Sequence, residues 1–329
     1  MQDGGRLLAS SARSIGILHA RHLGNMRVLI TGLAGFLGRH LARELQAHGW
    51  QVAGTVLAER AGLPGVEELH ADVTEAAALR RVVESWEPEA VVHLAGLTHV
   101  GSSWQQMPEY FRVNVEGTAN LLDAFAGEPV EAPGGRRVVF ASSAEVYGRV
   151  PEAEQPIGED RAPAPRSPYA LTKAAAELLM RRARAVTVRS FNIVGPGQAE
   201  SFALPSFARQ LAAIARGESE PTLRVGNLEA RRDFLHVADA VRAFRLLLER
   251  GEPGTTYNLG SGQALSIHEA LGRLMAVSGV AAEVEVDPER LRPVDVPLLE
   301  ADTSRLRALG WQPEGTLDDA LRALWESVR

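Results

Sequence analysis

The chain has 329 residues, with 35 basic side chains against 41 acidic ones, a formal net charge of −6 and 45% apolar residues. This balance is typical of a folded protein of about two domains, and it argues against disorder and against broad binding to nucleic acids or anionic membranes. The lack of cysteine excludes disulfides, thiolate metal sites and cysteine nucleophiles. The nine histidines show no metal-binding spacing and no apolar run could span a bilayer, so we expect no metal, no membrane segment and a cytoplasmic location.

Residues 1–25 differ in composition from the rest of the chain. They carry Arg6, Arg13 and Arg21 against a single acidic residue, and they show no helical or strand period. An arginine- and serine-rich composition is also that of a transit peptide. We expect a disordered extension here, or an upstream start codon with Met26 as the functional start.

From Met26 onward, short β-rich runs alternate with helical stretches. Several of the runs are continuously apolar, as strands buried on both faces are. The alternation predicts an α/β fold with a doubly wound parallel sheet and right-handed crossovers. The expected strands are 27–30, 51–56, 67–71, 90–94, 137–142, 185–192 and 255–259, and the expected helices are 36–48, 74–85, 114–125, 169–184 and 237–249.

The last third of the chain has a different pattern. Residues 201–217, 266–277 and 316–328 read as amphipathic helices, with Thr316 as the N-cap of the last one, and Pro- and Arg-rich loops separate them. Residues 237–260 are expected to return to the sheet. The sequence therefore predicts a larger sheet domain, 26–193 with about 233–262, and a smaller α-rich lobe, about 194–232 with 263–329.

A glycine-rich turn links the first expected strand to the first expected helix, in the order Thr31-Gly32-Leu33-Ala34-Gly35-Phe36-Leu37-Gly38. Gly32 allows the tight turn, Gly35 lets backbone N–H groups approach a pyrophosphate, and Gly38 allows close packing of helix against strand. Phe36 and Leu37 open the helix whose positive end would face the phosphate. The turn therefore predicts a Rossmann-type dinucleotide-binding domain.

The adenosine end of this expected cofactor site leaves the choice of cofactor open. The second strand ends without an acid at the usual ribose-binding position. Glu59 is a displaced candidate, while Arg39 and Arg60 are candidates for a 2′-phosphate or are solvated charges. We expect NADPH or NADH, with NADPH favoured. Further expected cofactor contacts follow the third and fourth strands: Asp72, Val73, Leu94, Ala95 and Gly96.

A serine, a tyrosine and a lysine make the strongest chemical pattern in the chain. Tyr169 and Lys173 are four residues apart and share one helix face, while Ser143 ends the fifth strand. An ammonium close to a phenol lowers the phenol pKa toward the range for proton transfer near neutral pH. Lys173 is the single lysine of the chain, which indicates a position that arginine cannot fill. We predict a proton-transfer site at these three residues.

Together, six segments resemble the extended short-chain dehydrogenase/reductase family, the NAD-dependent epimerases and dehydratases that act on nucleotide sugars. The resemblance extends essentially from Met26 to Arg329. It implies that Ser143, Tyr169 and Lys173 are the catalytic set, that Lys173 and Tyr169 also contact the cofactor, and that Asn192 lies near nicotinamide or substrate. The segments are Thr31–Gly38, Asp72–Val73, Leu94–Gly96, Ser142–Gly148, Tyr169–Lys173 and Arg189–Gly197.

Within that family, the C-terminal segments are similar to the GDP-4-keto-6-deoxy-D-mannose reductases and to the related GDP-mannose 4,6-dehydratases. The resemblance implies that Arg232 and Arg292 grip the diphosphate or ribose of a GDP-sugar, and that Asp295 accepts from ribose or guanine. Gln198 is a further expected substrate contact. A structural role is equally consistent with the sequence: Arg232 could form an ion pair with Asp233, and Arg292 could form one with Asp295. The similar segments are Gly195–Gln198, Ser201–Phe202, Val225–Ala230, Arg232–Phe234 and Leu291–Pro297.

The segment after the fifth strand separates reduction from dehydration. Dehydration needs extra acid–base groups, and here Glu145 is present while the polar residue expected before it is replaced by Ala144. Thr98, followed by His99, is similar to the dehydratases, so the motifs are mixed. Thr98, Ser143 and Glu145 are expected to contact the sugar in either case.

The resemblance implies NAD(P)H-dependent reduction of the C4 ketone of GDP-4-keto-6-deoxy-D-mannose to GDP-D-rhamnose or a close stereoisomer. Three alternatives stay open: a GDP-mannose 4,6-dehydratase, a nucleotide-sugar 4-epimerase, and a non-catalytic NAD(P)-binding regulatory protein. The family also implies a homodimer formed through helices 114–125 and 169–184.

Overall fold

The computed structural model describes residues 26–125, 136–291 and 296–329. A seven-stranded, wholly parallel sheet forms its centre, in the order β10-β6-β5-β4-β1-β2-β3, and this confirms the predicted fold class. The expectation for residues 1–25 lies outside the described residues. The strands are β1 (Arg27–Thr31), β2 (Gln51–Val56), β3 (Glu67–His70), β4 (Ala90–His93), β5 (Arg137–Ser143), β6 (Val186–Ser190) and β10 (Thr256–Leu259).

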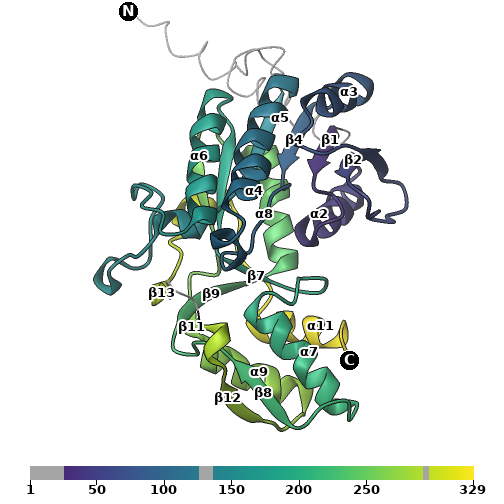
Figure 1. Cartoon of the computed structure of the whole chain (residues 1–329). Helices are drawn as coiled ribbons and strands as arrows, with labels where there is room; N and C mark the ends of the chain where they lie inside the picture. Colours follow the sequence, from purple (N-terminus) through teal and green to yellow (C-terminus); the bar gives the residue numbers. More distant parts are fainter. Residues whose placement is uncertain (1–25, 126–135, 292–295) are drawn as a thin grey trace, which may run out of the picture.

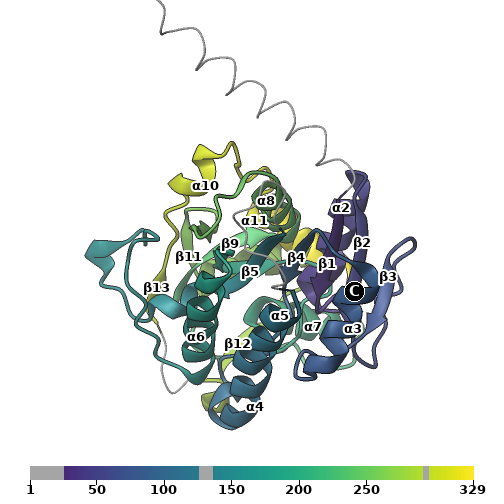
Figure 2. The ribbon, with the colours of Figure 1, turned by 90° about the horizontal axis from the view of Figure 1, so that it is seen from above.

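Helices cover both faces of this sheet (Figures 1 and 2). Residues alternate between the faces of a strand: Val28 and Ile30 of β1 pack in one core with α2 and α8, whereas Leu29 packs in the other with α3, α5 and α6. The sheet is thus buried on both sides, as its apolar strands require. The helices are α2 (Phe36–Ala47), α3 (Ala76–Trp86), α5 (Gly117–Phe125), α6 (Pro168–Arg182) and α8 (Val237–Arg250). None of the helices described is long and apolar enough to cross a bilayer.

The helix expected over 114–125 is longer and irregular. It opens as α4 (Met107–Phe111), passes through a π-helical turn over Arg112–Glu116 and continues as α5. Such turns are rare and often occur at functional sites. Here the turn carries Asn114, whose buried side chain bonds the backbone of Leu97.

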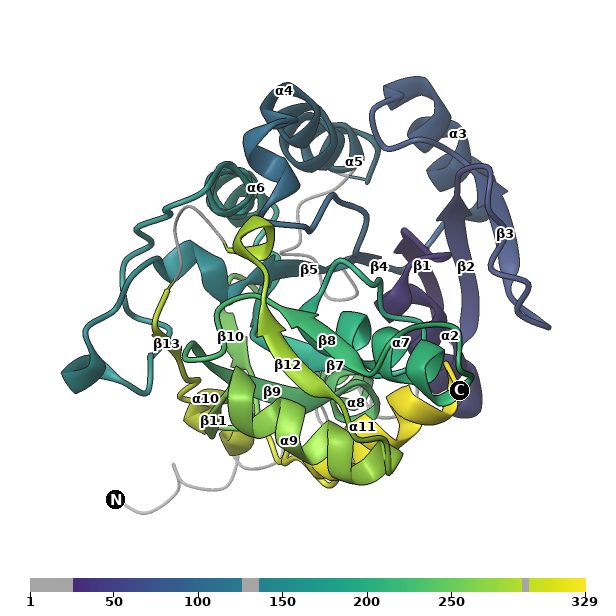
Figure 3. The ribbon, with the colours of Figure 1, turned by 60° about the horizontal axis from the view of Figure 1, so that its bottom comes forward.

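The C-terminal lobe has a separate core. Its elements lie below the sheet in Figure 1 and come forward in Figure 3. Its three helices match those expected, and Thr316 caps the last one as predicted. The lobe also contains short strands that the sequence did not predict, in a four-stranded and a two-stranded sheet. These elements are α7 (Ala203–Ala215), α9 (Ile267–Ser278), α11 (Leu317–Glu326), β7 (Asn192–Val194), β9 (Arg231–His236), β11 (Ala264–Ser266), β13 (Leu298–Leu299), β8 (Thr222–Val225) and β12 (Glu283–Val286).

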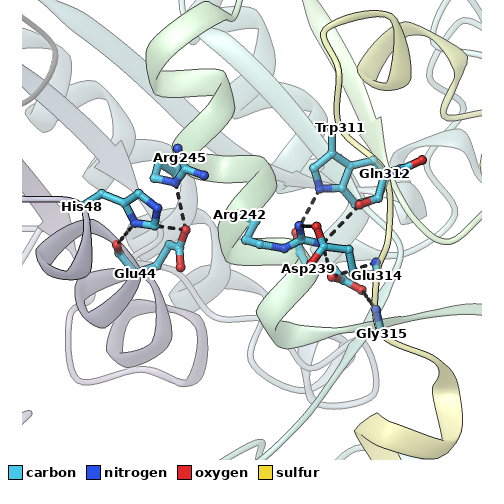
Figure 4. Close-up of polar contacts among 9 residues, drawn as sticks. All are labelled: Glu44, His48, Asp239, Arg242, Arg245, Trp311, Gln312, Glu314 and Gly315. Carbon is cyan, nitrogen blue, oxygen red and sulfur yellow. Dashed lines mark hydrogen bonds and ion pairs between the residues drawn. The ribbon is translucent and has the colours of Figure 1, made fainter.

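The segment before α11 is attached to the sheet domain. Leu306, in α10 (Ser304–Ala308), and Trp311 are buried in the core beneath α8. The Trp311 indole donates to the Asp239 carbonyl at 3.1 Å, and the Asp239 carboxylate accepts from the backbone N–H of Gly315 at 3.0 Å (Figure 4). The domain division expected from the sequence stays a prediction, because nothing tests its boundaries.

Candidate active site

A cleft of about 1030 Å³ lies where residues of the sheet's carboxyl edge meet residues of the smaller lobe. In parallel sheets, ligands bind outside the carboxyl ends of the strands. Fifteen of the expected site residues line this single cleft: Gly32, Gly35, Phe36, Leu37, Gly38, Leu94, Gly96, Thr98, Ser143, Glu145, Tyr169, Lys173, Asn192, Gln198 and Arg232.

The glycine turn presents an uncapped helix end to the cleft. Gly35 is the N-cap of α2, no side chain caps the helix, and its first turn has no acidic residue. Free N–H groups and the helix dipole favour an anion there. Gly32 has a φ of +75°, and a Cβ on it would lie 2.9 Å from the Ala95 backbone. A Cβ on Gly38 would lie 2.5 Å from the Gly32 oxygen, so both glycines are required by the turn.

Ser143, Tyr169 and Lys173 reach the cleft from two elements. Ser143 ends β5, and α6 begins with the Ser167 hydroxyl accepting from the Ala170 N–H at 3.1 Å. That cap sets the helix so that Tyr169 and Lys173 lie one turn apart on its buried face. The three residues are only 4–8% exposed. A hydrogen bond joins the side chains of Tyr169 and Ser143.

The protonation of Tyr169 differs from the expectation. Burial raises the pKa of Tyr169 well above its ordinary value, a nearby Glu145 charge adds to the rise, and the bond to Ser143 opposes it. The Lys173 ammonium donates to the Ala141 carbonyl at 2.8 Å and lies 5.0 Å from the centroid of the Phe140 ring. The direction of the pKa shift in this structure is thus opposite to the lowering that the sequence led us to expect. The phenol is protonated, which is the form that can donate a proton.

Lys173 is influenced by a buried carboxylate one turn further along α6. Burial lowers the pKa of Lys173 to about 8, and the Glu177 charge raises it. Glu177 accepts from the Ser142 hydroxyl at 2.6 Å and from the Arg189 guanidinium at 3.0 and 2.8 Å. This buried ion pair ties β5, β6 and α6 together beside the site.

Some expected site residues lie outside the cleft. Asp72 accepts from the Thr74 N–H and hydroxyl, both at 2.8 Å. Val73 packs beside Gly117, and Ala95 packs beside Gly32. A cofactor role for Asp72, Val73 and Ala95 therefore stays a prediction. Arg292 and Asp295 lie outside the described residues.

The candidate 2′-phosphate ligands are engaged with the protein. Arg39 donates to the carbonyls of Ala34 at 2.8 Å and Ala61 at 2.9 Å, and it pairs with Glu59. Arg60 donates to Glu68 at 3.0 Å. Arg39 thus fixes the loop after β2 against the glycine turn.

Four cleft residues were missed or left aside by sequence reasoning. Ser190 ends β6 directly opposite Ser143, and the rule that neighbouring parallel strands end at one edge could have found it. His99 bonds Ser102 at 3.0 Å, and Arg290 bonds the Ser206 hydroxyl at 3.3 Å. Gln105 also lines the cleft. No spacing signal marks Arg290, which stands two residues before the arginine that was singled out.

The cleft fits a nicotinamide dinucleotide. The Ser190 hydroxyl and the Gln198 side-chain oxygen are buried with no hydrogen-bond partner in the part of the chain that the structure describes. Buried polar atoms are normally paired, so both are available to a ligand. With the uncapped end of α2, they provide groups for a pyrophosphate and for a polar ring substituent.

The substrate side of the cleft is anchored by Arg232. This side chain is buried, and its guanidinium donates to the Val296 carbonyl at 2.7 Å. Asp233, the partner in the alternative ion pair, accepts through its carboxylate from the N–H groups of Ser261 at 2.6 Å and Gly262 at 2.9 Å. Arg232 is therefore positioned by backbone on the cleft wall.

Comparison with known proteins places this geometry among nucleotide-sugar enzymes. The family model described as GDP-mannose 4,6 dehydratase matches residues 29–324. The GDP-6-deoxy-D-mannose reductase of Pseudomonas aeruginosa is 36% identical, over 92% of this chain and 97% of the relative. The GDP-mannose 4,6-dehydratase of Vibrio cholerae is 30% identical, over 89% and 91%.

Solved structures agree with these matches. The structure of RMD from Pseudomonas aeruginosa complexed with NADPH has a TM-score of 0.79 at 36% identity, covering 92% of this chain and 97% of that one. The Thermus thermophilus UDP-glucose 4-epimerase complex with NAD has a TM-score of 0.82 at 30% identity, covering 92% and 99%. The expected use of a nicotinamide cofactor is consistent with both.

Proposed function

The chain belongs to the GDP-mannose 4,6-dehydratase family of extended short-chain dehydrogenases/reductases, and from that membership and the cleft we propose that it is the reductase of a GDP-linked 4-keto-6-deoxy sugar. The substrate is GDP-4-keto-6-deoxy-D-mannose, and the product is GDP-D-rhamnose or a close stereoisomer. When bound, a reduced nicotinamide would supply the hydride for C4. The residues that would hold the cofactor are the glycine turn, Ser190 and Lys173.

The side chains of the cleft supply the proton. Tyr169 keeps its proton because burial raises its pKa, and it gives that proton to the C4 oxygen as negative charge develops there. Ser143 donates a hydrogen bond to the same oxygen, which stabilises the charge. Lys173 remains cationic below about pH 8, so it favours the phenolate that Tyr169 becomes.

Two arginines supply charge for the GDP diphosphate. Arg232 lines the cleft from β9, and Arg290 lines it from the loop after β12. Guanidinium forks match phosphate oxygens in geometry and charge. Arg290 joins the expected set because the structure places it on the cleft wall, and Arg292 and Asp295 remain predicted contacts.

One observation carries the proposal: Tyr169, Ser143 and Lys173 share one cleft with the uncapped end of α2. The test is to incubate the protein with GDP-4-keto-6-deoxy-mannose and NADPH, and with GDP-mannose alone. In the first reaction we expect one NADPH to be oxidised for each molecule of 6-deoxy product formed. A lack of turnover with every 4-keto sugar nucleotide would refute the proposed reductase function.

A GDP-mannose 4,6-dehydratase is the second candidate, because Glu145 lines the cleft and its charge acts on Tyr169. A carboxylate there could remove the C5 proton. However, its neighbour Ala144 is buried and apolar, which leaves Glu145 without the second polar group expected for dehydration. Loss of GDP-mannose with no net cofactor consumption would favour this candidate, and interconversion of C4 epimers without net redox would favour an epimerase.

The oligomeric state is part of the proposal. Five large apolar side chains are partly exposed on three neighbouring elements. These elements are the turn before α4, α4 itself and α6, and they pack against one another. Leu171 and Leu178 are seven residues apart and share a face of α6. A symmetric homodimer would cover them, as we expected for α6. Light scattering tests this, and the cytoplasmic location stays a prediction. The side chains are Trp104, Met107, Phe111, Leu171 and Leu178.

A further inference from the structure

A buried histidine outside the cleft lies between the glycine turn and the catalytic helix. His93 is the last residue of β4 and is 1% exposed. Its Nδ1 lies 2.7 Å from the hydroxyl of Thr31, and its Nε2 lies 3.0 Å from the hydroxyl of Thr118. Both threonines are fully buried, so neither contact competes with water.

The hydrogen bonds around these threonines fix the proton on the ring. The Thr118 hydroxyl donates its single hydrogen to the Asn114 carbonyl at 2.7 Å, so Nε2 must be the donor toward Thr118. The Thr31 oxygen accepts from the Ala95 N–H at 3.2 Å, which leaves its own hydrogen for Nδ1. This pattern is that of a neutral His93 with its proton on Nε2, and burial favours the neutral form by lowering the His93 pKa.

One end of this series of hydrogen bonds is the glycine turn. Thr31 directly precedes Gly32, and a Cβ on Gly32 would lie 2.9 Å from Ala95. The bonds from Ala95 through Thr31 to His93 therefore hold the end of β1 against the end of β4. Gly32 and Leu94, one on each strand end, both line the cleft.

The other end of this series of hydrogen bonds is α6, the helix that carries Tyr169 and Lys173. The Asn114 side chain accepts from the Leu97 N–H at 2.8 Å and donates to the Thr172 hydroxyl at 3.0 Å. Thr172 is the neighbour of Lys173 on α6. A continuous run of bonds thus joins the glycine turn, β4, the π-helical turn and α6.

A ring stack forms a second link between His93 and Lys173. The His93 and Phe140 rings stack with centroids 5.8 Å apart, and the Lys173 ammonium lies 5.0 Å from the Phe140 centroid. Burial, with the nearby Lys173 charge, lowers the pKa of His93 to about 3. The residues that bond the ring from β1 and α5 are uncharged threonines, and the Lys173 ammonium on α6 is the charge that disfavours protonation of His93.

We propose that His93 is a positioning residue. As a neutral imidazole protonated on Nε2, it holds the glycine turn in a fixed position relative to α6, the helix that carries Tyr169 and Lys173. It contacts neither cofactor nor substrate, and acts through Thr31 and through Asn114. The assignment of the His93 tautomer rests on the contacts alone. The expected effect of His93 on NADPH binding rests on the proposed function.

The first test is ¹⁵N NMR of the full, histidine-labelled chain, with the His93→Phe spectrum identifying the His93 signals. We expect a protonated Nε2 and an unprotonated Nδ1 that do not change between about pH 5 and 8. A proton on Nδ1, or titration of the ring in that range, overturns the proposal. This measurement needs no substrate, so it stands whatever reaction the protein catalyses.

The second test separates positioning from packing. His93→Phe keeps a ring that can stack on Phe140 but removes both hydrogen bonds, and His70→Gln, on the exposed end of β3, is the control. We expect about tenfold weaker NADPH binding, measured well below the melting temperature, because two buried bonds are lost. The control binds like the wild type.

His93→Gln supplies an amide donor and acceptor, and is expected to recover part of the affinity for NADPH. A folded His93→Phe variant that binds NADPH within about twofold of the wild type overturns the positioning role. If His93→Phe fails to fold, His93→Gln identifies the NMR signals, and Thr31→Val, which removes the hydroxyl bonded to Nδ1, replaces His93→Phe in the binding test with the same expected loss of affinity.

Discussion

The two walls of the cleft are built differently. On the sheet side, Ser143, Tyr169 and Lys173 are almost completely buried and are bonded to neighbouring backbone and side chains. On the lobe side, Arg290 comes from an exposed loop and its side chain is 42% exposed. Buried groups hold one geometry, whereas exposed arginines adapt to a ligand. If the proposed function holds, the chemistry belongs to the rigid sheet wall and nucleotide recognition to the adaptable lobe wall.

Arg232 is the exception on the lobe side. It is buried like the catalytic residues, and backbone carbonyls position it. The contrast can therefore be tested by substitutions that should affect turnover on one wall and Michaelis constants on the other.

The largest effect is expected for Tyr169→Phe. Removing the hydroxyl removes the proton donor, so kcat should fall about 10²- to 10⁴-fold, while the buried ring keeps its packing. Steady-state reduction of the keto sugar measures this. Tyr257→Phe is the control, because that buried hydroxyl accepts from the Glu252 N–H, and Tyr257 is not among the cleft residues. If Tyr169→Phe turns over at the control's rate, the sheet wall does not contain the proton donor.

The sheet domain could be predicted from the sequence for a physical reason. Its strands are buried on both faces, so continuous runs such as Val28–Ile30 and Val91–Val92 stand out. The lobe strands lack this signal: β9 reads Arg-Arg-Asp-Phe-Leu-His and β12 reads Glu-Val-Glu-Val, with every residue of β12 exposed. Only tertiary pairing makes them strands.

The site shows the same limit. Spacing on α6 was enough to bring Tyr169 and Lys173 together, and the glycine turn was enough to place the cofactor end. Sequence could not give the direction of the Tyr169 pKa, because that depends on burial and on where the Lys173 ammonium bonds. It also missed Arg290, whose place in the cleft depends on Gly226, where a Cβ would lie 2.7 Å from the Arg290 oxygen.

The next effect sharpens the contrast between buried and exposed charge. Glu177→Gln leaves the buried Arg189 charge unpaired, and should lower the free energy of unfolding by about 3 kcal/mol or more. Glu44→Gln removes a partly exposed partner of Arg245 (Figure 4) and should cost about 1 kcal/mol or less. Chemical denaturation measures both. Equal losses would mean that the Glu177–Arg189 pair is not the rigid support of the sheet wall.

The pH dependence tests Lys173 directly. Its pKa is lowered to about 8 by burial, so as pH rises through 8 the ammonium is lost and NADPH binding should weaken. The unfolded chain keeps this proton until about pH 10.4. Between those values the unfolded state binds more protons, so the contribution of Lys173 to stability rises with pH.

Above about pH 8, loss of the Lys173 proton should therefore weaken NADPH binding while it raises the free energy of unfolding. The difference between wild type and Lys173→Met isolates it, with cofactor titration and denaturation measured across the pH range. A wild-type affinity that falls no faster than that of Lys173→Met would contradict the assignment.

The smallest effect is expected on the lobe wall. Arg290 pairs with Asp287 at 3.3 Å and is partly exposed, so water and that carboxylate already satisfy much of its charge. Its contact with a diphosphate should therefore be worth only about 1 kcal/mol, and Arg290→Gln should raise KM for the GDP-sugar about fivefold with kcat unchanged. Arg216→Gln, which breaks an exposed pair with Glu218, should change neither constant. A fall in kcat for Arg290→Gln would show that the lobe wall also shapes the reacting geometry, and the division between the walls would then fail.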